Sequence, residues 1–128
     1  PFSIYGHDQT RAFNSIGDAV LGTVLAVEKG TNQEIYHSGD SDEISIETLT
    51  RFVGELLKYV GDYEYAPTFP GSVSRRCPDI TKAKNDLGYS PSVQWQEGVT
   101  STINWYLDYL SGEESPHESF YDQYGIQQ

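Results

Sequence analysis

The sequence predicts a small α/β domain. Short segments with alternating polar and apolar residues favour β-strands, and they are separated by stretches in which apolar residues recur every three or four positions. Glycine and proline stand between these segments and mark the turns. With 128 residues, of which 37% are hydrophobic, the chain is long enough for one folded domain with its own core.

Four segments favour extended structure because they are short, rich in tyrosine or β-branched residues, and bounded by turn residues. They cover residues 2–5, 11–16, 34–38 and 63–66. Residues 67–76 follow the last of them as a loop rich in Pro, Gly and Ser. This loop is longer than most connections, which favours contact with a ligand.

Four further segments favour helices because their apolar residues have helical spacing and capping residues stand before them. They cover residues 18–28, 46–60, 80–87 and 97–110. Asp18, Ser45 and Asp79 are the expected N-terminal caps, and Gly88 is expected just beyond the end of the third helix. The apolar face expected on the first helix comprises Ala19, Val20, Val24, Leu25 and Val27. The two tryptophans, Trp95 and Trp105, are expected in the core.

The composition restricts the partners of this chain. Eight basic against 19 acidic residues give a net charge of −11, which repels nucleic acid and anionic membrane surfaces. No apolar run is long enough to cross a bilayer, and the single cysteine, Cys77, excludes an internal disulfide. We therefore expect a cytoplasmic protein. The chain contains no methionine and begins at Pro1 within an expected strand, so we expect a fragment of a longer protein.

Two arginines are candidates for binding a small anion. Arg11 follows the first turn, and Arg76 ends the long loop just before the third expected helix. An arginine can donate two parallel hydrogen bonds to a phosphate, and the free amides of a helix start would add to this attraction. The two side chains converging on a diphosphate would form a coherent site. The alternative is that each pairs with a surface carboxylate. We expect the neighbouring Arg75 to face solvent or a carboxylate.

Two elements of a nicotinamide-dependent enzyme do not occur in the sequence. There is no glycine-rich turn between a strand and a helix, because Gly17 and Gly22 lie at the edge of or within the first expected helix. No tyrosine is followed by a lysine four positions later. The three histidines have no metal-binding spacing and no cysteine companions, so the sequence predicts no metal site.

Several motifs nevertheless occur in a characteristic order. They are Gln9-Thr10-Arg11-Ala12-Phe13, Arg76-Cys77-Pro78-Asp79-Ile80-Thr81-Lys82-Ala83, Leu87-Gly88-Tyr89-Ser90-Pro91 and Glu97-Gly98-Val99. Over residues 2–110 this series resembles the carboxy-terminal part of the extended short-chain dehydrogenases/reductases that act on nucleotide sugars. It is similar to UDP-glucuronate decarboxylases, UDP-glucose 4-epimerases and dTDP-glucose dehydratases.

The resemblance implies that residues 1–110 form the lobe that holds the nucleoside diphosphate of a nucleotide sugar. An amino-terminal Rossmann lobe, absent from this chain, would bind NAD and carry the catalytic tyrosine and lysine. Arg11 would contact the substrate phosphates, and Arg76 would point into the diphosphate–sugar site. No catalytic, cofactor-binding or metal-binding residue is assigned to this chain, which would not be catalytic alone. The resemblance is also compatible with a homodimer of the intact enzyme.

The sequence leaves several alternatives open. Residues 111–128 are expected to form an acidic, loosely ordered tail. His37 stands where the family frequently has asparagine, the turn at His7 is shorter than usual, and residues 69–72 replace a stretch that often contacts the nucleotide. Sugar, base and reaction type therefore remain undetermined. A non-catalytic binding or interaction domain of the same ancestry is the alternative function.

Overall fold

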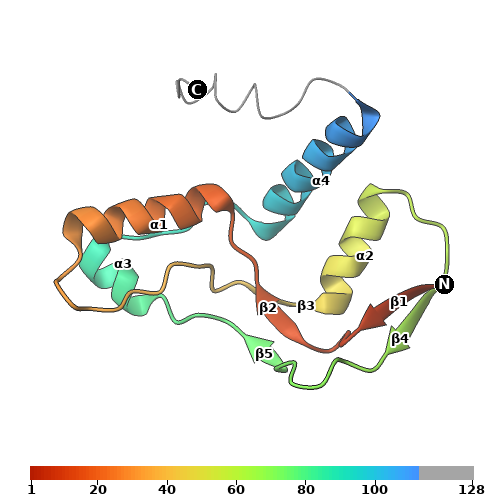
Figure 1. Ribbon diagram of the computed structural model, residues 1–128, viewed down its shortest axis with the longest axis horizontal. Helices are drawn as coiled ribbons and strands as arrows, with labels where there is room; N and C mark the ends of the chain where they lie inside the picture. Colours follow the sequence, from red (N-terminus) through yellow and green to blue (C-terminus); the bar gives the residue numbers. More distant parts are fainter. Residues whose placement is uncertain (113–128) are drawn as a thin grey trace.

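The computed structural model describes residues 1–112 of the chain. Figure 1 shows an elongated α/β arrangement of helices and two small sheets. Helices α1 (Ile16–Lys29) and α3 (Thr81–Leu87) pack together at one end. Helix α2 (Ile46–Leu56) lies beside a pair of strands at the other end, and α4 (Trp95–Ser111) rises between the two ends (Figure 1). The predicted α/β class is confirmed.

The first sheet consists of two parallel strands, and both were predicted within the correct bounds. Strand β1 (Phe2–Tyr5) pairs with β4 (Tyr63–Ala66), so that Phe2 lies opposite Tyr63. The alternating pattern buries Ile4, which is only 2% exposed. The local sequence patterns were enough to predict both strands, because turn residues bound each strand on both sides.

The second sheet has three short strands in the order β3-β2-β5. The central strand β2 (Thr10–Ala12) pairs antiparallel with β3 (Glu43–Ser45) and parallel with β5 (Arg75–Arg76). The prediction for residues 11–16 was therefore too long at its carboxyl end. Strand β3 was not predicted, and β5 lies at the end of the predicted loop.

The predicted strand at Glu34–Ser38 is wrong, because this segment is not paired with any strand of the described chain. The amide of Glu34 instead donates to the carbonyl of Thr31 across a turn. The hydroxyl of Tyr36 accepts a hydrogen bond from the Thr31 amide, at 3.2 Å, and its ring packs against the core. A segment with β-like composition forms no strand without a neighbouring strand to pair with.

Helix α1 begins earlier than predicted because Ser15, not Asp18, is its N-terminal cap. The Ser15 hydroxyl accepts a hydrogen bond from the Asp18 amide at 3.1 Å. Asp18 lies in the first turn, where it is 3% exposed. Its carboxylate accepts hydrogen bonds from the amides of Ser92 and Val93 at 3.1 and 3.0 Å. The side chain predicted to start the helix therefore anchors the segment that leads into α4.

The apolar face predicted for α1 is mostly wrong. Val20 and Val27 are 54% and 84% exposed, and only Leu25, of the predicted set, contacts the core in part. Gly22 is buried, and a Cβ atom there would lie 2.5 Å from the Cβ of Ser38. Close approach at a glycine, and not a stripe of large apolar residues, lets this helix pack on its neighbours.

The remaining helix ends follow local signals to different extents. Ser45 caps α2 as predicted, through a 3.0 Å hydrogen bond from the Thr48 amide, but the helix ends at Leu56 and not near Gly61. Asp79 binds the Thr81 amide, although Ile80 occupies the cap position of α3. Gly88 ends α3 with a left-handed φ of 72°, as predicted. Helix α4 begins at Trp95, two residues before the predicted start.

The core is small and lies between α1 and α3. Its buried residues are Ile80, Ala83, Leu87 and Tyr89, and the partly buried residues against them are Leu25, Ala26 and Tyr36. Trp95 is also buried, and its ring meets the edge of Phe52 at a centroid distance of 4.9 Å. Trp105 is 38% exposed, so its predicted place in the core is wrong. No helix among residues 1–112 is long and apolar enough to cross a membrane.

Exposed apolar side chains follow one stripe of α1 and generate a first prediction. Ile16, Val20 and Val27 are separated by helical spacing and are all more than half exposed. We expect the purified 128-residue chain to bind a hydrophobic dye and to melt over a broad temperature range. Replacing Val20 and Val27 by glutamine should lower dye fluorescence without lowering the melting temperature, because neither side chain is buried. A sharp transition with no dye binding would contradict this description.

The anchor at Asp18 generates a second prediction. Burial raises the pKa of the Asp18 carboxyl, but hydrogen bonds from Val93, Ser92 and Ser15 outweigh it and hold that pKa below its ordinary value. Because the folded pKa lies below the unfolded value of about 3.9, the stabilisation is present above that pH and is lost as the pH falls through the folded pKa.

We expect Asp18→Asn to lower the free energy of unfolding by about 2 kcal/mol at pH 7, since hydrogen bonds to a charged acceptor are replaced by neutral ones. The difference from wild type should shrink at pH 3. Asp42→Asn, at an exposed carboxylate, serves as the control. Urea denaturation measures both variants, and a pH-independent difference at Asp18 would contradict the assignment.

Candidate functional site

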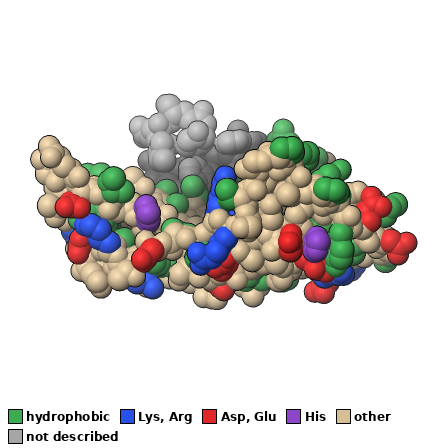
Figure 2. All heavy atoms as spheres, turned by 90° about the horizontal axis from the view of Figure 1, so that it is seen from below, with side chains coloured by type: hydrophobic (Ala, Val, Ile, Leu, Met, Phe, Trp, Pro, Cys, Tyr) green, Lys and Arg blue, Asp and Glu red, His purple; other side chains and the backbone are tan. Residues whose placement is uncertain are grey.

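The two predicted arginines lie side by side on neighbouring strands. Arg11 on β2 is the register partner of Arg76 on β5 in a parallel pairing. Register partners of paired strands place their side chains on the same face of a sheet. The structure therefore brings together two residues that lie 65 positions apart in the sequence (76 − 11). Figure 2 shows basic side chains near the middle of the face seen from below, where β5 lies in Figure 1.

The guanidinium group of Arg11 is held by the protein itself. Nη1 donates to the carbonyls of Thr10 and Ser74 at 2.6 and 3.4 Å, and Nη2 donates to the carbonyl of Val73 at 2.9 Å. Nη2 also donates to Oε1 of Gln9 at 3.0 Å. Among residues 1–112 Arg11 forms no ion pair, so the alternative of a surface carboxylate partner does not describe it. Its Nε–H group is left for a further acceptor.

Arg76 differs from Arg11 in being exposed. Within the described part of the chain its side chain forms neither an ion pair nor a hydrogen bond, although 19 acidic residues occur in the sequence. At the start of α3 one amide is already occupied. That helix has seven residues, and the amide of Thr81 at its start is already bound by the carboxylate of Asp79 at 2.9 Å.

Arg75 lies on the opposite face of the same sheet and has a carboxylate partner, as predicted. Its Nε and Nη2 donate to Oε2 of Glu43 at 3.0 and 2.7 Å. The hydroxyl of Thr10, the register partner of Arg75, donates to the other carboxylate oxygen of Glu43. The hydrogen bonds from Thr10 and Arg75 lower the pKa of Glu43. One face of the strand pair is thus neutralised internally, whereas the other presents two guanidinium groups.

Gln9 also belongs to the site, although the sequence indicated it only as part of the motif at residues 9–13. Its side chain is buried, with 8% exposure, and contacts Arg11 and two positions of the loop between β4 and β5. Nε2 donates to the hydroxyl of Thr68 at 2.9 Å, and Oε1 accepts from the hydroxyl of Ser72 at 2.9 Å. A polar residue two positions before a candidate phosphate-binding arginine, on the same side of the strand, is the sequence signal that could have indicated it.

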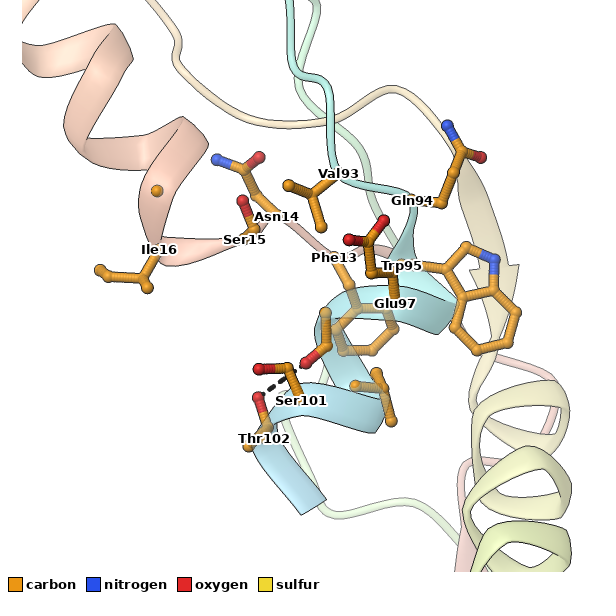
Figure 3. A pocket seen from close by; sticks show the side chains of 13 residues that line it. Phe13, Asn14, Ser15, Ile16, Val93, Gln94, Trp95, Glu97, Ser101 and Thr102 are labelled. Atoms are coloured by element: carbon orange, nitrogen blue, oxygen red, sulfur yellow. Dashed lines mark hydrogen bonds between the residues drawn. The ribbon is translucent and has the colours of Figure 1, made fainter. Parts of the chain in front are cut away.

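A separate cavity of about 490 Å³ lies beyond the carboxyl end of β2 (Figure 3). The connection from β2 to α1 lines it on one side, with Phe13 and Asn14, and the start of α4 lines it on the other, with Trp95. The buried Oδ1 atom of Asn14 has no hydrogen-bond partner among the described residues. Neither arginine lines this cavity, so it is distinct from the arginine pair.

Other polar candidates form no further site within residues 1–112. No group of three or more His, Cys, Asp or Glu side chains is placed to hold a metal ion there. His7 stacks on Tyr65 at a centroid distance of 3.9 Å, and His37 is exposed. Tyr5 stacks on Phe69 of the loop at 5.1 Å, which places an aromatic pair beside the first sheet.

The described residues do not fit a dinucleotide cofactor. The connection from β2 to α1, residues 13–15, contains no glycine, and a phosphate cradle needs close backbone approach there. Gly17 lies within the first turn of α1, and the space beside Gly22 is filled by Ser38 and Tyr89. Both glycines therefore lie inside the helix, and neither stands in a turn between a strand and a helix, where a pyrophosphate cradle would need it.

Comparison with known proteins shows that this chain is similar to part of several enzymes that act on nucleotide sugars. No protein-family model matches it. A UDP-N-acetyl-alpha-D-glucosaminuronate decarboxylase from Bacillus cytotoxicus is 32% identical over 112 residues, which cover 82% of this chain and 35% of that protein. A UDP-glucuronic acid decarboxylase from Xenopus tropicalis is 32% identical over 105 residues, covering 81% of this chain and 25% of that protein.

Solved structures give the same result. A UDP-glucose 4-epimerase from Thermotoga maritima, determined with UDP-glucose, matches 85% of this chain and 35% of its own length, with a TM-score of 0.79 and 30% identity. A dTDP-glucose 4,6-dehydratase from Streptomyces venezuelae, determined with NAD, matches 88% of this chain and 35% of its own length, with a TM-score of 0.77 and 27% identity.

The predicted resemblance to NAD-dependent nucleotide-sugar epimerases, dehydratases and decarboxylases of the extended short-chain dehydrogenase type is therefore confirmed. The likeness is partial, because the chain spans about a third of the length of the relatives it matches.

Proposed function

We propose that residues 1–110 are the substrate-binding lobe of an NAD-dependent nucleotide-sugar epimerase, dehydratase or decarboxylase. The lobe would hold the nucleoside diphosphate, and a further lobe of the enzyme would bind NAD and supply the acid–base residues. Related structures that contain UDP-glucose, or UDP-glucuronic acid with NAD, support this assignment. The absence of a dinucleotide cradle among the described residues is consistent with the division of labour.

The observation that carries the proposal is the pairing of Arg11 with Arg76 on one sheet face. Two positively charged side chains at paired positions on one sheet face favour the binding of an anion beside them. Arg75, one residue away, has taken a carboxylate partner, whereas Arg76 has none within residues 1–112 despite the acidity of the chain. A diphosphate supplies several acceptor oxygens to such a pair at once. Holding it there would position the sugar for reaction elsewhere in the enzyme.

Replacing Arg76 by alanine tests the proposal in the complete protein that contains this chain. We expect the dissociation constant of uridine diphosphate to rise roughly ten- to a hundredfold, because charge-assisted hydrogen bonds of about 1.5–3 kcal/mol are lost. Arg11→Ala should have a similar effect. Arg11→Lys should recover only part of the affinity, since an ammonium group cannot replace the several donors of a guanidinium.

Arg75→Ala is the matched control for these variants. This side chain has the same chemistry and nearly the same sequence position, but it faces Glu43 on the opposite side of the sheet. We expect it to change the affinity for uridine diphosphate less than about twofold. Isothermal titration calorimetry measures each variant, with NAD affinity as the reference that should stay constant. The proposal is wrong if Arg76→Ala binds like wild type or if Arg75→Ala is the more costly change.

The proposal that this lobe binds the substrate and a different lobe binds NAD can be tested with the isolated 128-residue chain. We expect it to show no turnover of nucleotide sugars and no measurable NAD binding, because the connection from β2 to α1 lacks the glycines of a dinucleotide cradle. Calorimetry with NAD measures this directly. Micromolar NAD binding by the isolated chain would contradict the assignment of this lobe to the substrate alone.

A further inference from the structure

Gln9 joins three parts of the arginine site through one buried carboxamide. Oε1 accepts hydrogen bonds from Nη2 of Arg11 and from the hydroxyl of Ser72, at 3.0 and 2.9 Å. Nε2 donates to the hydroxyl of Thr68 at 2.9 Å. Both oxygen lone pairs are therefore used, and the amide bridges β2 to the start and the middle of the loop that leads to β5.

The orientation of this carboxamide is fixed by its neighbour. A guanidinium group can only donate hydrogen bonds, so the atom of Gln9 that faces Arg11 must be the oxygen. The nitrogen then has to face Thr68, whose hydroxyl can accept. The backbone of Gln9 is fixed as well, since its amide donates to Gly6 and its carbonyl accepts from Ile46. Gly6, at a φ of 63°, leaves no room for a Cβ atom, which would lie 2.8 Å from Cδ of Gln9.

The same network determines where Arg76 lies. The loop ends in Val73 and Ser74, whose carbonyls accept hydrogen bonds from Arg11, and Ser74 also accepts from the Thr10 amide at 2.9 Å. Strand β5 has only two residues, so its own ladder to β2 is short. The register of Arg76 beside Arg11 therefore depends on contacts made by the loop, and two of these contacts are made by Gln9.

We propose that Gln9 is a positioning residue for anion binding. Its carboxamide orients the Arg11 guanidinium and holds the loop so that both arginines face the same diphosphate. Gln9 acts through Arg11 and the loop and does not contact the ligand itself. This inference rests on the proposed function of the arginine pair.

A double-mutant cycle between Gln9 and Arg11 tests the inference, with uridine diphosphate as the probe in the complete protein. Gln9→Met keeps the length of the side chain but removes all three hydrogen bonds. We expect it to raise the dissociation constant about tenfold while NAD affinity stays constant. In the Arg11→Ala background the same change should cost clearly less than tenfold, because the guanidinium that Gln9 orients is gone and only its contacts with the loop remain. If Gln9 had a purely structural role, the fold-losses of affinity in the two single variants would multiply in the double variant.

A second variant tests the inference independently in case Gln9→Met does not fold. Thr68→Val combined with Ser72→Ala removes the loop partners of Gln9 at two exposed side chains. We expect at least a threefold loss of affinity for uridine diphosphate, which should also shrink in the Arg11→Ala background. The inference is overturned if either variant binds like wild type or if its loss multiplies fully with that of Arg11→Ala. Unchanged binding by Arg76→Ala would instead overturn the proposed function.

Discussion

The candidate site depends on the parallel pairing of β2 with β5. Both strands are short, and the pairing joins residues that are far apart in the chain. Closing so long a loop costs conformational entropy that a ladder of two residue pairs offsets only in part. The side chains of Gln9 and Arg11 add contacts to the loop at Thr68, Ser72, Val73 and Ser74. The pairing is thus stabilised by the residues whose geometry it determines.

Side chains alternate between the two faces of a strand, and this explains why the consecutive residues Arg75 and Arg76 have different roles. Arg75 and Thr10 face Glu43, where hydrogen bonds from Thr10 and Arg75 lower the pKa of the carboxyl and keep it charged. Arg76 and Arg11 face the other way, without a carboxylate from residues 1–112. A shift of one residue in the register of β5 would exchange the two arginines. Register, more than composition, therefore separates an internal ion pair from an anion site in this acidic chain.

The sequence predicted those features that depend on neighbouring residues. The strands at 2–5 and 63–66, the cap at Ser45 and the left-handed Gly88 follow from turn and capping preferences, and the structure contains them all. The failures involve contacts between distant residues. Glu34–Ser38 has strand-like residues but no strand beside it, and Asp18 is bound by Ser92 and Val93 from a segment about 75 residues away. Both arginines were identified from the sequence, but their shared register and the contacts of Gln9 required the fold.

The distribution of apolar surface separates the arginine pair from the rest of the molecule. The pair lies on a sheet whose three strands all come from this chain, and its supporting contacts are internal. Half of the large exposed apolar side chains of the described residues lie elsewhere, along α1 and the second half of α4. The buried Oδ1 of Asn14, which has no hydrogen-bond partner within residues 1–112, also lies away from the pair, at the cavity between these two helices. The geometry for holding a diphosphate is therefore built within this chain, whereas the apolar surfaces of α1 and α4 are not covered by any described part of it.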